Sequence, residues 1–159
     1  MKRLAWLFIA GFFVYMGIEV IFGAIFSGSL ALEGHTSIWM GFVGGFILIL
    51  FSIINQSEIV KNKPLWIQAL YGAIMITFIE FWSGYLLNID WELDIWDYSS
   101  LPLNICGQVD VIFMVLWFFL APFAYWADDF LEWIFYKTGY RSKAPNACSL
   151  WGFYKRLFK

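Results

Sequence analysis

Four long apolar stretches constrain this chain more than any other feature of its sequence. They cover residues 4–26, 38–55, 65–88 and 109–126, and together they contain three acidic residues and no lysine or arginine. A helix of about 20 apolar residues crosses the hydrocarbon core of a bilayer, and in lipid the backbone has to satisfy its own hydrogen bonds. The sequence therefore predicts an all-α polytopic membrane protein with a bundle of four transmembrane helices.

The composition supports a lipid environment. Hydrophobic residues make up 62% of the 159 residues and charged residues 14%, whereas about 25% of a typical soluble domain is charged. A soluble domain of this size could not bury so much apolar surface. The net charge of -2 does not indicate a partner such as nucleic acid. The expected partner is the lipid bilayer.

The distribution of basic residues predicts the topology. All ten lie near the two ends or in the middle loop: Lys2, Arg3, Lys61, Lys63, Lys137, Arg141, Lys143, Lys155, Arg156 and Lys159. The loops at 27–37 and 90–107 contain no lysine or arginine. Because basic loops stay on the cytoplasmic side, we expect both termini to be cytoplasmic.

The region after the fourth stretch suggests a second unit. Asp128, Asp129 and Glu132 alternate with apolar residues there, so we expect the helix to enter the lipid headgroups at this point. Residues 150–158 place apolar side chains on one helical face opposite basic ones, which is typical of an interfacial amphipathic helix. We therefore divide the chain into a four-helix transmembrane domain (1–137) and a cytoplasmic basic amphipathic tail (138–159).

Two acidic residues lie inside predicted spans at a similar depth. Glu19 and Glu80 each follow the start of their span by about 15 residues, which places both in the outer half of the bilayer at about 1.5 Å per residue. An acid in a span costs about 2.5–3.5 kcal/mol on insertion scales and usually marks function. Two interpretations remain open: a site that binds protons or a cationic or polar group, and a neutral glutamate that only locks helix packing.

The segment before the fourth span carries a distinctive motif. It reads Trp96-Asp97-Tyr98-Ser99, then Pro102, Asn104 and Gly107, after a helix that contains Glu80. This pattern resembles the bacterial family called "Putative ABC-transporter type IV" membrane proteins, and the resemblance covers roughly residues 5–125. It implies a small multipass protein of the inner membrane. The chain has no Walker G-x-x-x-x-G-K-[ST] motif, so any ATPase would have to be a separate partner.

These features favour a transport function. We expect a permease-like membrane component with a polar intramembrane pocket built on Glu19 and Glu80, with Asn104 and Asp110 as further substrate-binding or proton-binding residues. The alternative is a small scaffold or accessory subunit that binds a partner helix or a lipid headgroup. A thin four-helix bundle also favours a homo-oligomer or a larger membrane complex.

Catalysis is not expected. The sequence shows no Ser/His or Cys/His arrangement, and its two cysteines, Cys106 and Cys148, lack the spacing of a metal site. We therefore expect no enzymatic activity, no catalytic residues, no metal and no cofactor.

Overall fold

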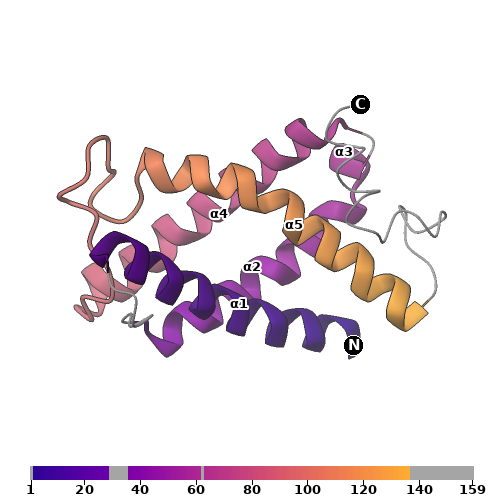
Figure 1. Ribbon diagram of the computed structural model, residues 1–159, viewed down its shortest axis with the longest axis horizontal. Helices are drawn as coiled ribbons and strands as arrows, with labels where there is room; N and C mark the ends of the chain where they lie inside the picture. Colours follow the sequence, from indigo (N-terminus) through magenta and orange to yellow (C-terminus); the bar gives the residue numbers. More distant parts are fainter. Residues whose placement is uncertain (1, 29–35, 62, 137–159) are drawn as a thin grey trace.

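The computed structural model describes residues 2–28, 36–61 and 63–136, and its regular elements in this part of the chain are helices. Their order along the chain is α1 (Lys2–Ser27), α2 (Ile38–Gln56), α3 (Glu58–Lys61), α4 (Leu65–Gly84), the π-helix η1 (Tyr85–Asp90) and α5 (Val111–Tyr136). Figure 1 shows them as one helical bundle. The predicted all-α fold class is confirmed.

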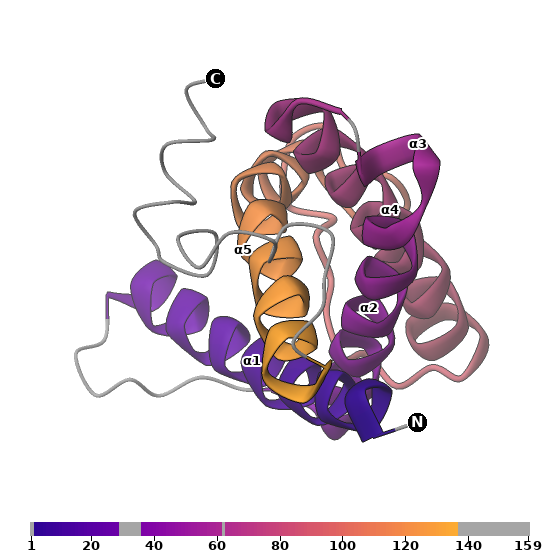
Figure 2. The same ribbon diagram turned by 90° about the vertical axis from the view of Figure 1, so that its right-hand side faces the viewer.

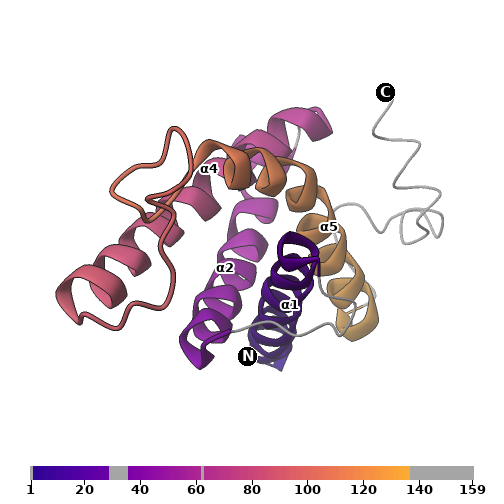
Figure 3. The ribbon, with the colours of Figure 1, turned by 60° about the vertical axis from the view of Figure 1, so that its left-hand side comes forward.

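The four predicted spans correspond to four helices that are long and apolar enough to cross a membrane. The largest difference is in the last one, which continues to Tyr136 instead of ending near 126. Pro122 lies inside this helix, where it removes a backbone hydrogen bond, and Figure 3 shows that α5 changes direction along its course. The predicted amphipathic tail and its domain boundary lie outside the described residues.

The two ends of the bundle differ in what they carry. The start of α1 and the end of α5 lie at one end, which we call the Arg3 end, and residues 91–110, the outer segment, lie at the other (Figure 1). Seen from the Arg3 end, α1 starts on the side of α5 where α2 and α4 lie and runs obliquely past α5 to the opposite side (Figure 2).

Glycines allow α1 and α2 to approach closely, as small residues do in membrane helices. A Cβ atom on Gly44 would collide with Tyr15 and with the Gly11 carbonyl, and Gly41 and Gly45 face the rings of two phenylalanines of α1. Figure 3 shows α1 alongside α2. This packing fixes the position of Tyr15, which is buried.

The centre of the bundle is apolar and joins α2, α4 and α5. Phe51 of α2 and Tyr125 of α5 are fully buried, and their ring centroids lie 4.9 Å apart. Gly72 of α4 lies against Phe51 and Ala121. Above this core, α4 passes directly into η1, a rare helix type that occurs often near functional sites.

Candidate functional site

Glu80 of α4 is the most enclosed acidic residue in the half of the bundle next to the outer segment. Its side chain is buried, and both of its oxygens accept hydrogen bonds from neighbouring helices. The Tyr15 hydroxyl of α1 donates to Oε1, and Trp117 Nε1 of α5 donates to Oε2 at 2.7 Å. The rings of Tyr15 and Trp117 are stacked with centroids 5.7 Å apart. Glu80 therefore connects three transmembrane helices.

Two further acids lie within electrostatic range of Glu80. They are Glu19 of α1 and Asp110, directly before α5. We call Glu19, Glu80 and Asp110 the acid cluster. Among the described residues, no group of three or more His, Cys, Asp or Glu side chains is arranged to hold a metal ion. Glu19 and Asp110 therefore influence Glu80 electrostatically, but the three carboxylates do not form a metal-ligand set.

Asp110 has one oxygen with a structural role and one without a partner. Its Oδ1 accepts from the backbone N–H groups of Ile112 at 2.6 Å and Phe113 at 3.3 Å, which is the geometry of a helix N-cap. This explains why α5 starts at Val111. Its Oδ2 is buried and has no hydrogen-bond partner among the described residues. An acceptor of this kind is available to a bound proton or donor.

The outer segment contributes Tyr98 to the same region. The Tyr98 ring stacks on Phe113 of α5 with centroids 4.8 Å apart. Burial raises the pKa of Tyr98 well above the usual tyrosine value, and the carboxylates of the acid cluster raise it further. The Tyr98 hydroxyl therefore stays protonated near the cluster and can act as a hydrogen-bond donor there.

A network of amide groups fastens the outer segment to the helices. Asn88 of η1 donates to the side-chain oxygen of Gln108 at 2.8 Å and to the Trp96 carbonyl at 3.0 Å. The indole N–H of Trp96 donates to the Gln108 carbonyl at 3.0 Å. Gly84 leaves room for this contact, because a Cβ atom there would meet Gln108 and Trp96. The segment is thus attached to the top of α4.

The remaining residues of the predicted motif shape the outer segment. The Asp97 side chain is exposed and accepts from the Ser99 N–H at 2.8 Å, and hydrogen bonds from Ser99 lower the pKa of Asp97. Gly107 has a φ of 68° and lies against Asp97 and Ser99, where a side chain would be strained. Pro102 is exposed on the same segment. These residues form a compact turn that is joined to Tyr98 by the hydrogen bond from the Tyr98 N–H to the Gly107 carbonyl.

Asn104 has a local role in this turn. Its amide nitrogen donates to the carbonyls of Leu101 at 2.7 Å and Ser99 at 3.3 Å, and its oxygen accepts from the Gly107 N–H at 3.0 Å. Both polar atoms are therefore used within the outer segment. A binding role for Asn104 stays a prediction.

Sequence reasoning did not identify the two residues that bind Glu80. Trp117 and Tyr15 come from other helices, so no spacing within one helix could reveal them. Their residue types were the available signal, because buried indole and phenol groups usually need a hydrogen-bond partner.

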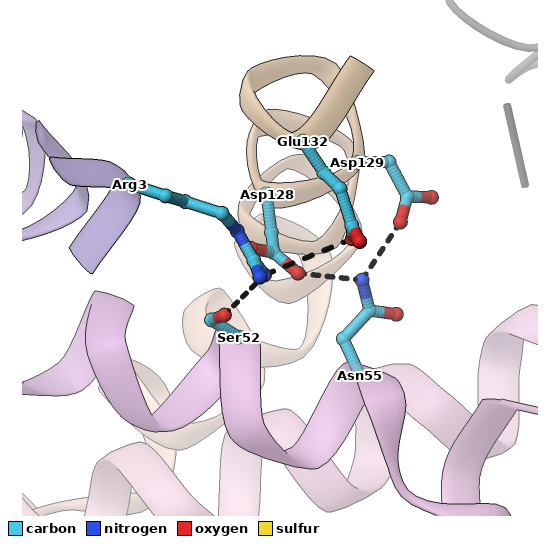
Figure 4. Close-up of polar contacts among 6 residues, drawn as sticks. All are labelled: Arg3, Ser52, Asn55, Asp128, Asp129 and Glu132. Carbon is cyan, nitrogen blue, oxygen red and sulfur yellow. Dashed lines mark hydrogen bonds and ion pairs between the residues drawn. The ribbon is translucent and has the colours of Figure 1, made fainter. Parts of the chain in front are cut away.

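A second polar cluster at the Arg3 end was also missed (Figure 4). Arg3 of α1 donates to Ser52 of α2 and to Asp128 Oδ1 of α5 at 2.5 Å. Asn55 donates to Asp128 at 2.9 Å and to Asp129 at 2.8 Å. Both aspartates are buried and face other helices; that α5 enters the lipid headgroups at this point stays a prediction. The sequence could have predicted this pair, because the predicted topology places Arg3 and Asp128, which carry opposite charges, on the same side of the membrane.

The family comparison agrees with the motif in the outer segment. The model of the family described as "Putative ABC-transporter type IV" matches residues 6–151. The chain belongs to this family. No solved structure matches it. Membership and the four apolar helices together indicate a multipass membrane protein related to transport, and they point to a transport component of a membrane complex rather than to an enzyme.

Proposed function

We propose that this protein is a permease-like transport component whose acid cluster exchanges protons or binds a small cation. The observation that carries the proposal is the buried Glu80 of α4 with two further carboxylates, Glu19 of α1 and Asp110 at the start of α5, within electrostatic range of it. One of their oxygens, Asp110 Oδ2, is buried without a partner among the described residues.

The charge balance supports this reading. No lysine or arginine occurs between Arg3 and Lys61 or between Lys63 and Lys137, and Arg3 is bound to Asp128 at the opposite end. A carboxylate buried without a counter-charge is costly. Bound protons or a bound cation would supply the missing positive charge. In this proposal Tyr98 covers the cluster on its outer side, and Tyr15 and Trp117 hold Glu80 from within.

The scaffold function remains a second candidate because of one specific observation. Both oxygens of Glu80 already accept hydrogen bonds from the bundle, as expected of an acid that only holds helices together. In that case the acid cluster would shape a surface for a partner helix or a lipid headgroup.

The test uses the full chain in lipid vesicles that contain a trapped pH-sensitive dye. A potassium diffusion potential drives protons through the protein, with sodium or tetramethylammonium added outside as the probe cation. Glu80→Gln and Glu19→Gln should reduce the proton flux to the level of protein-free vesicles, because a side-chain amide does not take up and release a proton as a carboxyl group does. Glu92→Gln is the matched control, since Glu92 is exposed on the outer segment.

The two candidates differ in their outcomes. Flux in the wild type that both buried-acid variants abolish supports transport. Wild-type vesicles that equal protein-free vesicles with every probe cation contradict it. Copurification from native membranes then tests the scaffold function, which expects Glu80→Gln to lose a partner that the wild type and Glu92→Gln both retain.

The remaining features of the proposal concern location and assembly. We propose that the protein lies in the bacterial inner membrane with both termini in the cytoplasm, because the basic residues gather at the ends and the middle loop. A separate ATPase and a homo-oligomer or larger complex are the proposed partners. The proposed boundary between transmembrane domain and tail is residue 137.

A further inference from the structure

An apolar cavity of about 330 Å³ lies between α1, α2 and α5 and reaches Tyr15 and Trp117, the two donors to Glu80. Binding pockets for small ligands start at about this volume. Apolar side chains line nearly all of it; the exceptions that carry a polar group are Tyr15, Trp117 and Trp126. The cavity therefore suits a hydrocarbon rather than a polar ligand.

The cavity is open toward lipid. Val14 of α1 and Phe123 of α5 both line it, yet they are 58% and 44% exposed. Exposed residues of a membrane-spanning helix face lipid or another helix. The opening therefore lies between α1 and α5, at a depth where the surrounding molecules are hydrocarbon chains.

The dimensions of the cavity match one acyl chain. Along α1 its lining extends from Ala10 to Ile18, and along α5 from Trp117 to Ala127. At about 1.5 Å per residue these stretches are about 12 Å and about 15 Å long. Half of a hydrocarbon core of about 30 Å is also about 15 Å. The cavity is therefore about as long as one leaflet is thick.

The Arg3 end of the cavity carries a polar group that needs a partner. Trp126 lines this end, and its indole nitrogen is buried without an acceptor among the described residues. Trp126 lies two residues before Asp128, which binds Arg3. Tryptophan is typical of the boundary between hydrocarbon and headgroups, where the ester carbonyls of lipids are available as acceptors.

We propose that this cavity is a lipid-binding site, in which one acyl chain of a phospholipid from the leaflet at the Arg3 end lies between α1 and α5. The favourable contribution is van der Waals contact between the acyl chain and the cavity walls. The end of the chain reaches Tyr15 and Trp117, the two donors to Glu80. The bound lipid therefore supports the wall that holds Glu80, whether or not the protein transports.

The experiment uses the full chain in vesicles of phosphatidylethanolamine and phosphatidylglycerol. The probe is a phosphatidylglycerol with a photoactivatable diazirine in the middle of one acyl chain, and peptide mass spectrometry locates the crosslinks. We expect crosslinks to concentrate on residues 10–18 and 117–127. The exposed face of α4 around Phe78 serves as the reference for ordinary contact with bulk lipid.

Two variants fill the cavity from opposite walls. Ala10→Leu and Ala124→Leu each put a larger side chain into the lining of the cavity. Each should lower crosslinking to the cavity about tenfold, which corresponds to a loss of about 1.4 kcal/mol in binding free energy. Ala5→Leu is the matched control on α1, because Ala5 is exposed and outside the cavity. Crosslinking around Phe78 should stay unchanged in all three variants.

Several results would overturn the proposal. Crosslinks spread evenly over all lipid-facing helices would identify only bulk lipid. Equal labelling of the cavity in the wild type and in either filled variant would show that the chain lies elsewhere. Weaker labelling of residues 10–18 and 117–127 than of the region around Phe78 would mean that something other than lipid, such as a second protein molecule, covers the opening. None of these outcomes depends on proton flux, so this test is separate from that of the proposed function.

Discussion

Replacing Arg3 with glutamine should destabilise the protein far more than replacing its partner Asp128 with asparagine. Asp128 is fully buried, and its charged contact is the 2.5 Å pair with Arg3. Arg3→Gln leaves that carboxylate with Asn55 as a neutral donor. Removal of one partner of a buried ion pair costs about 3–5 kcal/mol. This cost is not reduced by solvent screening, because the side chains of Arg3 and Asp128 are only 12% and 0% exposed.

Replacing Asp128 instead leaves Arg3 with two of its polar partners. After Asp128→Asn, Arg3 keeps its hydrogen bond to Ser52 and the ion pair with Glu132 at 3.8 Å. The expected cost is about 1–2 kcal/mol, the size of a lost charged hydrogen bond that is partly replaced. The double variant should be more stable than Arg3→Gln alone, because it removes the unpaired charge.

Thermal unfolding of the full chain in nanodiscs, followed by tryptophan fluorescence, measures the difference. For a chain of this size about 1 kcal/mol shifts the melting temperature by about 2–4 °C, so we expect a fall on the order of 10 °C for Arg3→Gln and about 4 °C for Asp128→Asn. Lys2→Gln is the control, since Lys2 is exposed. Equal melting temperatures for the Arg3 and Lys2 variants, or a larger loss for Asp128→Asn, would refute the reasoning.

Three further predictions concern the outer segment and the topology. Gly107→Ala should cost about 1–2 kcal/mol because the residue has a φ of 68°, and its melting temperature should fall accordingly. Because the pKa of Tyr98 is raised in the folded protein, its stabilising contribution is complete below the pKa of tyrosine in the unfolded chain, about 10, and is lost as the pH rises beyond that value. The melting temperature of Tyr98→Phe should therefore fall less steeply than that of the wild type as the pH rises above about 10. An impermeant maleimide should label Cys106, which is exposed on the outer segment, in intact cells, and Cys148 only after the membrane is opened; labelling of Cys148 in intact cells would reverse the proposed orientation.

The spans and the glycine contacts were predictable because the bilayer removes most alternatives. A charge-free stretch such as 38–55 has to be helical in lipid, and its glycines have to pack, since Gly41, Gly44 and Gly45 all face α1. The start of α5 was predicted two residues early, because an N-cap such as Asp110 marks the helix start more sharply than hydropathy does. The π-helix η1 carries no hydropathy signal, so the role of Asn88 could not be foreseen.

The polar contacts between helices were predictable in kind but not in identity. Hydropathy places Glu80 at its depth, and the cost of burying an acid implies that it has partners there. Which residues serve depends on the rotation of each helix about its axis, and α1 has a wide choice of apolar faces because apolar residues surround it on nearly every side. Lipid supplies no hydrophobic force to select one face. The rotation of α1 is instead selected by its few polar contacts, Arg3 with α5 at one end and Tyr15 with Glu80 at its middle, together with the glycine surface of α2. Residues that look ordinary in the sequence, such as Tyr15 and Trp117, therefore become decisive only once the helices are assembled.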